Sequence, residues 1–304
     1  MDILFINPGS SEEVYQGLST DYAGIGTPYW ALLLSQSCRS QGYKVGILDI
    51  LAEGISRKDA VERIKTLNPR LISVCVYGEN VNSGTTQMSG AVKLANLIKE
   101  SGIDIPISFV GSHVQALPYK VLSEEPNIDI IFTNEGVYSL WNILKLKDLT
   151  DKKQLETING IGFIKDGKPH LNQPEKIVPN DRMDLDLPGY AWDLLPYKET
   201  PFDLYRSPMW HGEYDHDKRT PYAALYTSLG CVFQCEFCMI NILNRDDNEE
   251  IGVAGNYNKM RFWSPEFIIK EFDKLIEMGV ETIRIADEMF LLNPKYYIPL
   301  VDLL

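Results

Sequence analysis

Residues 1 to about 147 alternate short apolar runs with segments of helical spacing. Continuous apolar runs such as residues 71–77 are typical of strands that are buried on both faces of a parallel sheet. Strands that alternate with helices predict an α/β fold with a doubly wound parallel sheet and right-handed crossovers. We expect strands at residues 3–6, 44–49, 71–77, 105–110 and 129–133, and helices at 30–41, 56–67, 86–101, 119–124 and 137–146.

The loops that follow these strands are rich in glycine and small polar residues. Ligands of doubly wound sheets bind beyond the carboxyl ends of the strands, and glycine allows a ligand to approach the backbone closely. No G-x-G-x-x-G follows the first strand, which disfavours a nicotinamide-dinucleotide site. The candidate ligand loops are residues 7–10, 78–84, 111–115 and 134–136.

Three of the five cysteines, Cys231, Cys235 and Cys238, have the spacing C-x3-C-x2-C. Thiolates this close in sequence can converge on zinc, copper(I) or an iron–sulfur cluster. No fourth cysteine lies nearby, so three thiolates would leave one metal position open, as a catalytic centre requires. The loop follows an expected strand at 222–227, whose carboxyl end faces the active site in a barrel of βα units.

A structural zinc site is the alternative for these cysteines. Zinc usually takes two paired half-sites, and His211 with His216 in a polar loop makes a poor second half. The two remaining cysteines, Cys38 and Cys75, lie in helical and strand patterns, and we expect both in the core.

The net charge and the hydropathy of the chain limit the classes of partner that it can bind. The net charge is −13 and no basic tract is longer than two residues, which disfavours a nucleic-acid partner. No apolar run is long enough to span a bilayer, and the N-terminus has the pattern of a strand rather than of a signal peptide. We therefore expect a cytoplasmic protein without a membrane partner, in a compartment where clustered cysteines favour metal binding or catalysis over disulfides.

The cysteine spacing after a strand, with the aromatic Phe237 before the last cysteine, resembles the signature of radical S-adenosylmethionine (SAM) enzymes. The resemblance implies that the three cysteines hold three irons of a [4Fe–4S] cluster whose fourth iron binds SAM. It also implies SAM contacts from Phe237 and from Ala286, Asp287 and Glu288, which follow the strand expected at 281–286. The alternative is that Asp287 and Glu288 only cap the following turn.

The order strand, Gly111-Ser112-His113, helix, strand, Asn134-Glu135-Gly136 resembles the Rossmann-like cobalamin-binding domain that precedes the barrel in one branch of these enzymes. The chain lacks the Asp-x-His-x-x-Gly motif of other cobalamin proteins, so we expect no histidine from that motif on cobalt. The resemblance implies cobalamin contacts from Asn7, Pro8, Gly78, Glu79, Asn80, Gly111, Ser112, His113, Asn134, Glu135 and Gly136.

Three regions are expected. Residues 1–147 form the cobalamin-binding domain. Residues 148–220 form a connector, with a hairpin that turns at Asp166-Gly167 and a strap rich in proline and aromatic residues that packs between the domains. Residues 221–304 begin a radical SAM (β/α) barrel, but the chain stops within the second helix after Cys238. We therefore expect a fragment of a longer protein, or a barrel that is completed elsewhere.

The resemblance implies a cobalamin-dependent radical SAM methyltransferase that methylates an unactivated carbon. Its cofactors would be a [4Fe–4S] cluster, SAM and cobalamin, and its partners a small-molecule or peptide substrate and an electron donor such as flavodoxin or ferredoxin. Two alternatives stay open: a rearrangement or cyclisation without methyl transfer, and a non-catalytic fragment that binds the cofactors. The sequence identifies no catalytic residue.

Overall fold

A seven-stranded sheet with the order β2-β1-β3-β4-β5-β6-β7 forms the centre of the molecule. The computed structural model describes residues 1–10, 13–14, 16, 24–78, 80–207, 221–250 and 257–304. The first five strands are parallel, which confirms the doubly wound sheet. They are β1 (Ile3–Asn7), β2 (Val45–Asp49), β3 (Leu71–Cys75), β4 (Ile107–Val110) and β5 (Ile130–Phe132).

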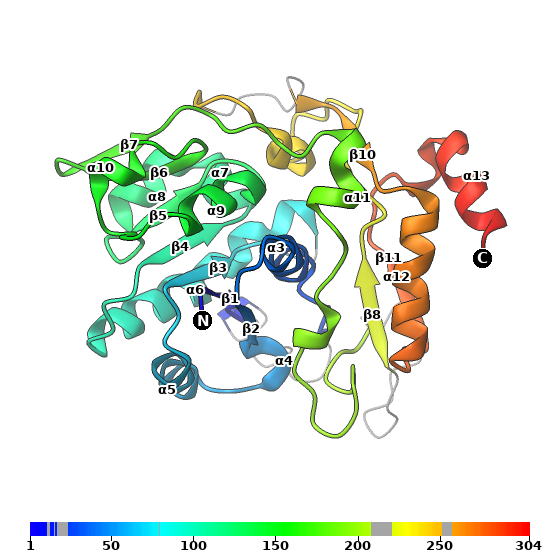
Figure 1. The fold of residues 1–304 in the computed structure, drawn as a ribbon, viewed down its shortest axis with the longest axis horizontal. Coiled ribbons are helices and arrows are strands. Elements are labelled where there is room, and N and C mark those ends of the chain that lie inside the picture. The colour runs from blue at the N-terminus through cyan, green and yellow to red at the C-terminus, as the bar shows by residue number, and fades with distance from the viewer. Residues whose placement is uncertain (11–12, 15, 17–23, 79, 208–220, 251–256) are drawn as a thin grey trace.

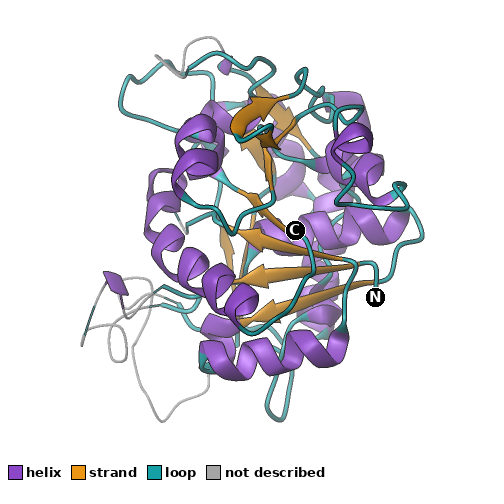
Figure 2. Ribbon diagram, turned by 90° about the vertical axis from the view of Figure 1, so that its left-hand side faces the viewer, coloured by secondary structure: helices purple, strands orange, loops and turns teal. Residues whose placement is uncertain are grey.

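Helices cover both faces of this sheet (Figures 1 and 2). On one face, α3 (Tyr29–Ser40) and α9 (Val137–Leu144) share a core with Ile3 and Phe5 of β1. On the other face, α5 (Arg57–Leu67) and α6 (Gly84–Glu100) share a core with Leu4 and Ile6. Successive strand residues point to opposite faces, so a continuous apolar run is what a sheet covered on both faces requires.

Short helices lie between these elements. The loop expected at residues 111–115 is largely helical: it contains most of α7 (Ser112–Ala116), and Gly111 precedes this helix with φ 152°. A side chain at position 111 would clash with the Val76 carbonyl, so the tight turn after β4 requires glycine. The other short helices are α4 (Ile50–Glu53), α8 (Pro118–Glu124), α10 (Lys152–Leu155) and α11 (Met183–Asp186), with 3-10 turns η1 (Val81–Ser83), η2 (Asn180–Arg182), η3 (Trp192–Leu194), η5 (Ile240–Asn244) and η7 (Phe290–Leu292).

The hairpin expected in the connector is present as β6 (Ile161–Lys165) and β7 (Lys168–Leu171). Asp166 and Gly167 both have positive φ, which suits a two-residue hairpin turn. β6 also pairs antiparallel with β5. The sheet of the first region therefore continues past residue 147 and includes the hairpin.

The region after residue 220 contains a βαβ unit. β8 (Tyr222–Leu225) and β11 (Thr282–Ile285) pair in parallel, and α12 (Pro265–Glu277) connects them along the chain, as expected. β9 (Ser228–Gly230) and β10 (Met260–Phe262) form an antiparallel pair that the sequence did not predict. α13 (Pro294–Asp302) follows and lies beside α12 at the edge of the molecule (Figure 1).

The aromatic residues of the strap pack between the two ends of the molecule. Tyr190, Trp192, Phe202 and Tyr205 are buried and join the core that contains α3, β8 and α12. The expected interdomain packing is confirmed for these residues, whereas Tyr197 is exposed. Along the described parts of the chain, no helix has both the length and the hydropathy needed to cross a bilayer.

Cys38 and Cys75 are buried, as expected. Burial raises the pKa of both thiols above the ordinary cysteine value. These two cysteines are therefore neutral core residues at physiological pH.

Candidate functional site

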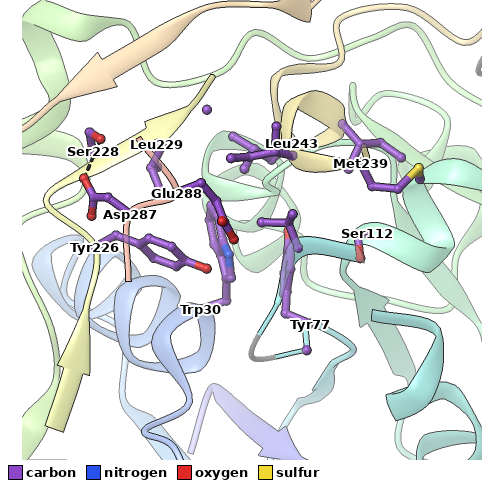
Figure 3. Close-up of a pocket in the computed structure, with 15 residues that line it drawn as sticks. Trp30, Tyr77, Ser112, Tyr226, Ser228, Leu229, Met239, Leu243, Asp287 and Glu288 are labelled. Carbon is purple, nitrogen blue, oxygen red and sulfur yellow. Dashed lines mark hydrogen bonds between the residues drawn. The ribbon is translucent and has the colours of Figure 1, made fainter. Parts of the chain in front are cut away.

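A pocket of about 530 Å³, partly open to solvent, lies between the carboxyl edge of the large sheet and the carboxyl ends of β8 and β11. Figure 3 shows the labelled side chains converging on it from segments far apart in the sequence. The lining residues are Trp30, Tyr77, Gly78, Val81, Ser112, Tyr226, Ser228, Leu229, Gly230, Met239, Ile240, Ile242, Leu243, Asp287 and Glu288.

Aromatic side chains form one wall of the pocket. The rings of Trp30 and Tyr77 stack with centroids 4.8 Å apart, and Tyr226 lies beside them in the lining. The Tyr77 hydroxyl accepts a hydrogen bond from Gln115 Nε2 at 2.8 Å. Burial raises the pKa of Tyr77 and of Tyr226 well above the ordinary tyrosine value. Both phenols therefore stay protonated, and this wall is uncharged.

Asp287 holds the connection between β8 and β9 in place. Its carboxylate accepts hydrogen bonds from the Thr227 backbone N–H at 2.6 Å, from Thr227 Oγ1 at 2.8 Å and from Ser228 Oγ at 2.5 Å. Burial raises the pKa of Asp287 to about 6, against the effect of these donors. Glu288 is exposed and lines the same pocket. Glu288 is therefore the carboxylate of this pair that can receive a ligand cation.

The cysteine loop has one anchored end and one exposed end. Cys231 is buried, and its backbone N–H donates to Asn241 Oδ1 at 2.8 Å. Its sulfur accepts a hydrogen bond from the Phe233 N–H at 3.4 Å. Cys235 is exposed, and the Cys238 N–H donates to the Cys235 carbonyl at 3.0 Å. The loop thus presents its second and third thiols from a turn that follows a fixed first thiol.

The donor chemistry of this loop fits an iron–sulfur cluster. Three thiols are present, and a backbone N–H already points at the Cys231 sulfur, as hydrogen bonds do at cluster thiolates. Within the described residues, no three metal-binding side chains converge. Residues on both sides of the loop, Gly230 and Met239, line the pocket. A group bound by the three thiols would therefore lie beside the pocket.

Comparison with known proteins adds independent evidence for the family. Residues 15–143 match the B12 binding domain family. The whole chain superposes on a radical SAM methyltransferase, TsrM from Kitasatospora setae, with a TM-score of 0.64 at 13% identity, covering 99% of this chain and 50% of that one. The cobalamin-dependent radical SAM enzyme OxsB gives a TM-score of 0.59 at 18% identity, covering 95% and 34%. The chain has the fold of these two enzymes, and its first region matches the B12 binding domain family.

Curated proteins of similar sequence include a methyltransferase and a cyclase. The chain is 25% identical to the uncharacterized methyltransferase PH0819 of Pyrococcus horikoshii, over 97% of this chain and 55% of that protein. It is 22% identical to the anaerobic magnesium-protoporphyrin IX monomethyl ester cyclase of Cereibacter sphaeroides, over 98% and 42%. The chain thus spans about half the length of the curated relatives that it matches.

The residues expected to bind cobalamin fall into two groups in the B12-binding domain. Gly78 and Ser112 line the pocket, and His113 lies next to Ser112. His113 Nδ1 is 2.9 Å from Thr85 Oγ1, and burial, together with Lys120, lowers the pKa of the imidazole. Asn80 caps η1 through a hydrogen bond from the Asn82 N–H. Glu79 lies outside the described residues, as do His211 and His216 of the alternative zinc site.

The second group makes contacts inside the protein. Asn7 Nδ2 donates to the buried carboxylate of Asp49 at 2.8 Å, and Pro8 is buried beside it. Asp49 also accepts from the Tyr205 hydroxyl at 2.9 Å, and burial raises the pKa of Asp49 to about 6. The amide of Asn7 therefore orients an internal carboxylate that joins β2 to the strap.

The motif after β5 is also turned inward. Asn134 Nδ2 donates to the Glu175 carbonyl at 2.8 Å, and Gly136 has φ 83°. Glu135 is buried and pairs with Arg261 of β10 at 2.7 Å. These contacts place the motif against the hairpin and the cysteine segment. Ala286, by contrast, directly follows β11 and donates its N–H to the Leu225 carbonyl, and Phe237 is 81% exposed.

The sequence did not predict the aromatic wall. Trp30 lies at the start of a helix whose apolar spacing indicated only a core face, and Tyr77 ends an apolar run that indicated a buried strand. The position of Tyr77 directly before Gly78 was the available signal, because residues at the carboxyl end of a parallel strand face the ligand edge.

Proposed function

We propose that this chain is the cofactor-binding part of a cobalamin-dependent radical SAM methyltransferase that acts on an unactivated carbon of a small-molecule or peptide substrate. One observation carries the proposal. A single pocket is lined both by the ligand edge of the B12-binding domain and by residues on either side of the cysteine loop. Two cofactors held on these two sides would face the same space.

Each cofactor has candidate residues. Cys231, Cys235 and Cys238 would hold a [4Fe–4S] cluster. Glu288 would receive the amino group of SAM, and Gly78 and Ser112 would lie against cobalamin. When bound, the cluster supplies one electron to cleave SAM and the cobalamin supplies the methyl group. In this proposal flavodoxin or ferredoxin delivers the electron, and Cys235 and Phe237 form an exposed end of the loop that a donor can approach.

The protein's own residues would exclude water and fix charge at this site. Trp30, Tyr77 and Tyr226 give the pocket an uncharged aromatic wall, which offers no ionised group near the reacting atoms. Asp287 is engaged by Thr227 and Ser228 and keeps the strand ends in register. Positioning and shielding are the contributions that proteins make to cofactor chemistry of this kind.

A cyclisation or rearrangement without methyl transfer is the second candidate. It is favoured by the similarity to two anaerobic magnesium-protoporphyrin IX monomethyl ester cyclases. The two reactions differ in products, since methyl transfer adds a methyl group to the substrate and the second reaction does not.

Anaerobic reconstitution of the purified chain with iron, sulfide and hydroxocobalamin tests the proposal. Cluster and cobalamin absorbance are both expected, followed by release of 5′-deoxyadenosine when SAM and a reductant are added. The variant Glu288→Gln is expected to raise the SAM concentration needed for half-maximal cleavage by about tenfold, because the charge opposite the amino group is lost. Absence of both spectra would contradict the proposal. Binding of both cofactors without SAM cleavage would support the alternative of a non-catalytic fragment.

A further inference from the structure

Loops at the ligand edge of the B12-binding domain contact the segment that carries the cysteines at three places. The loop after β3, the helix after β4 and the turn after β5 each make one of these contacts. They are Met239 N–H to Asn82 Oδ1 at 2.7 Å, Arg245 Nη1 to the Gln115 carbonyl at 2.6 Å, and Arg261 Nη2 to Glu135 Oε2 at 2.7 Å. The elements expected to surround cobalamin are thus also the elements that hold the cysteine segment.

The pair between Glu135 and Arg261 is the most buried of these contacts. The two side chains are 1% and 3% exposed. Glu135 Oε1 accepts from the Val178 N–H at 2.6 Å, and Arg261 Nη1 donates to the Val178 carbonyl at 2.8 Å. Both charges are therefore compensated without solvent. A buried ion pair with such partners fixes one geometry, because any displacement leaves a charge uncompensated.

Arg261 connects this pair to the strand before the cysteines. It lies opposite Leu229 in the pair β9–β10, and its Nη2 also donates to Asn244 Oδ1 at 3.0 Å. Asn244 Nδ2 in turn donates to the Lys259 carbonyl at 2.9 Å. A side chain at Gly230, which has φ 90°, would clash with that same carbonyl. Arg261 and Asn244 therefore set the backbone directly before Cys231.

The 3-10 turn η5 completes the connection to the first thiol. Asn244 ends this turn, and Asn241 within it accepts the Cys231 N–H and donates to the Phe233 carbonyl at 3.3 Å. Two hydrogen bonds from Arg261, the backbone of η5 and the bond from Asn241 thus connect Glu135 to the backbone of the first cysteine.

We propose that Glu135 and Arg261 are positioning residues that couple the two cofactor sites, so that cobalamin and the iron–sulfur cluster bind cooperatively. The inference rests on the proposed function, because it needs both cofactors. Cobalamin at the ligand edge and the cluster at the cysteines would then both favour the geometry that this pair fixes between the turn after β5 and the β9–β10 connection. Coupling between two sites is reciprocal, so the cluster raises the affinity for cobalamin by the same factor.

The test uses the full chain and measures the hydroxocobalamin dissociation constant by ultrafiltration, before and after anaerobic reconstitution with iron and sulfide. In the wild type, the cluster is expected to lower this constant by about fivefold or more. The double variant Glu135→Gln/Arg261→Met removes both charges together, which avoids leaving one buried and unpaired. In this double variant, the hydroxocobalamin dissociation constants before and after reconstitution are expected to be equal. We call the dissociation constant without the cluster divided by that with the cluster the ratio. The conservative variant Arg261→Lys keeps the charge and is expected to retain part of the wild-type ratio.

Two control variants separate coupling from general destabilisation. Arg39→Met breaks the pair between Arg39 and Asp193, which also joins the first region to the strap but is half-exposed and has no contact with the residues that connect Glu135 to Cys231. Val61→Ala weakens the core under α5. Both are expected to keep the wild-type ratio. The spectrum of the reduced cluster in electron paramagnetic resonance should also shift on cobalamin addition in the wild type and stay unchanged in the double variant.

The outcomes distinguish the two proposals. If the wild type fails to bind either cofactor, the proposed function fails and the coupling fails with it. If both cofactors bind but the wild-type ratio is 1, or the double variant keeps the wild-type ratio, then the coupling alone is wrong. If Val61→Ala loses the ratio as the double variant does, the pair acts through stability and is not a positioning device.

Discussion

The B12-binding domain and the segment after residue 220 are built from the same kind of unit but differ in how completely their apolar surfaces are covered. The residues of β1 from Ile3 to Ile6 are 0% exposed, between helices on both faces. All four residues of β11 are only partly buried, and the last two helices expose Ile276 at 61% and Val301 at 52%. The first region thus covers its strands on both faces, whereas the segment that carries the cysteines leaves part of its apolar surface exposed.

The two regions therefore have different structural roles. The large sheet ends in an edge of glycine-rich turns. The later segment places the cysteines against that edge through polar contacts and through the core that it shares with α3 and the strap. Small local elements of low contact density open more readily than core strands. The cysteine segment is therefore the part whose order depends on its partners.

The cysteines give the largest expected difference between the regions. The triple variant Cys231→Ala/Cys235→Ala/Cys238→Ala should abolish iron binding, because no thiolate remains in the loop. The matched variant Cys38→Ala/Cys75→Ala changes the two buried cysteines of the first region. It should retain the full iron content, measured by a colorimetric iron assay after reconstitution. Equal iron in the triple variant and the wild type would overturn the assignment of the cluster to this loop.

A matched pair of isoleucines tests the difference in burial. Ile6→Ala removes a side chain that is 0% exposed and should lower the free energy of unfolding by about 2–5 kcal/mol. Ile283→Ala in β11 removes one that is only partly buried and should cost about 1 kcal/mol. Urea unfolding followed by circular dichroism measures both. The comparison between regions breaks down if Ile283→Ala proves as costly as Ile6→Ala.

The sheet could be predicted from the sequence because its signals are local. A strand buried on both faces needs an uninterrupted apolar run, and the runs around Phe5, Val74 and Phe109 meet that need within a few residues. The hairpin turn at Asp166-Gly167 is equally local. The pair β9–β10 escaped prediction because its strands have three residues each and Arg261 interrupts one of them.

The candidate site could be predicted only in part, for the same reason. The cysteine spacing lies within eight residues, from 231 to 238, and needs no knowledge of the fold. The contact of Glu135 with Arg261 joins residues 126 positions apart, and nothing in either neighbourhood indicates the other. Glu135 was expected at the cofactor on its motif alone, whereas its carboxylate lies in an internal ion pair.

Each region has a carboxylate whose burial should make the stability of the protein depend on pH. Burial raises the pKa of Asp49 and of Asp287 to about 6 in the folded protein, from the ordinary aspartate value of 3.8. Below pH 3.8 each aspartate is protonated in the folded and in the unfolded protein, and its contribution to the free energy of unfolding is fully present. It is lost as the pH rises through 6, because the folded protein must then hold a buried charge. Each group should lower the stability by up to about 3 kcal/mol between pH 4 and pH 7.

The variant Asp49→Asn should remove the contribution of Asp49 to this pH dependence. The double variant Asp49→Asn/Asp287→Asn should remove the contributions of both carboxylates. Asparagine can still accept from Asn7 and the Ala52 N–H. Urea unfolding at pH 4.5 and pH 7.5 measures the slope. An unchanged slope in the double variant would show that these two carboxylates are ionised at both pH values in the folded state.

The N-caps of α5 and α12 provide a comparison of one residue in each region, with the smallest expected changes in stability. Ser56 caps α5 by accepting the Asp59 N–H at 3.2 Å, and its hydroxyl donates to the Asp59 carboxylate in the same turn. Ser264 caps α12 in the same way but donates to Asp184, 80 residues earlier in the strap. Ser56→Ala should cost about 1 kcal/mol.

Ser264→Ala should cost about 1–2 kcal/mol, because it removes both the cap and a partner of the Asp184 carboxylate. The double variants Ser56→Ala/Asp59→Ala and Ser264→Ala/Asp184→Ala separate the two contributions through their interaction energies. A larger interaction energy is expected at Ser264, since its acceptor Asp184 lies in a different segment of the chain, whereas Asp59 lies in the same turn as Ser56. Equal interaction energies would mean that α12 is held to the strap by its apolar face, including Ile268 and Phe272, and that the polar contact adds nothing to the attachment of the cysteine segment.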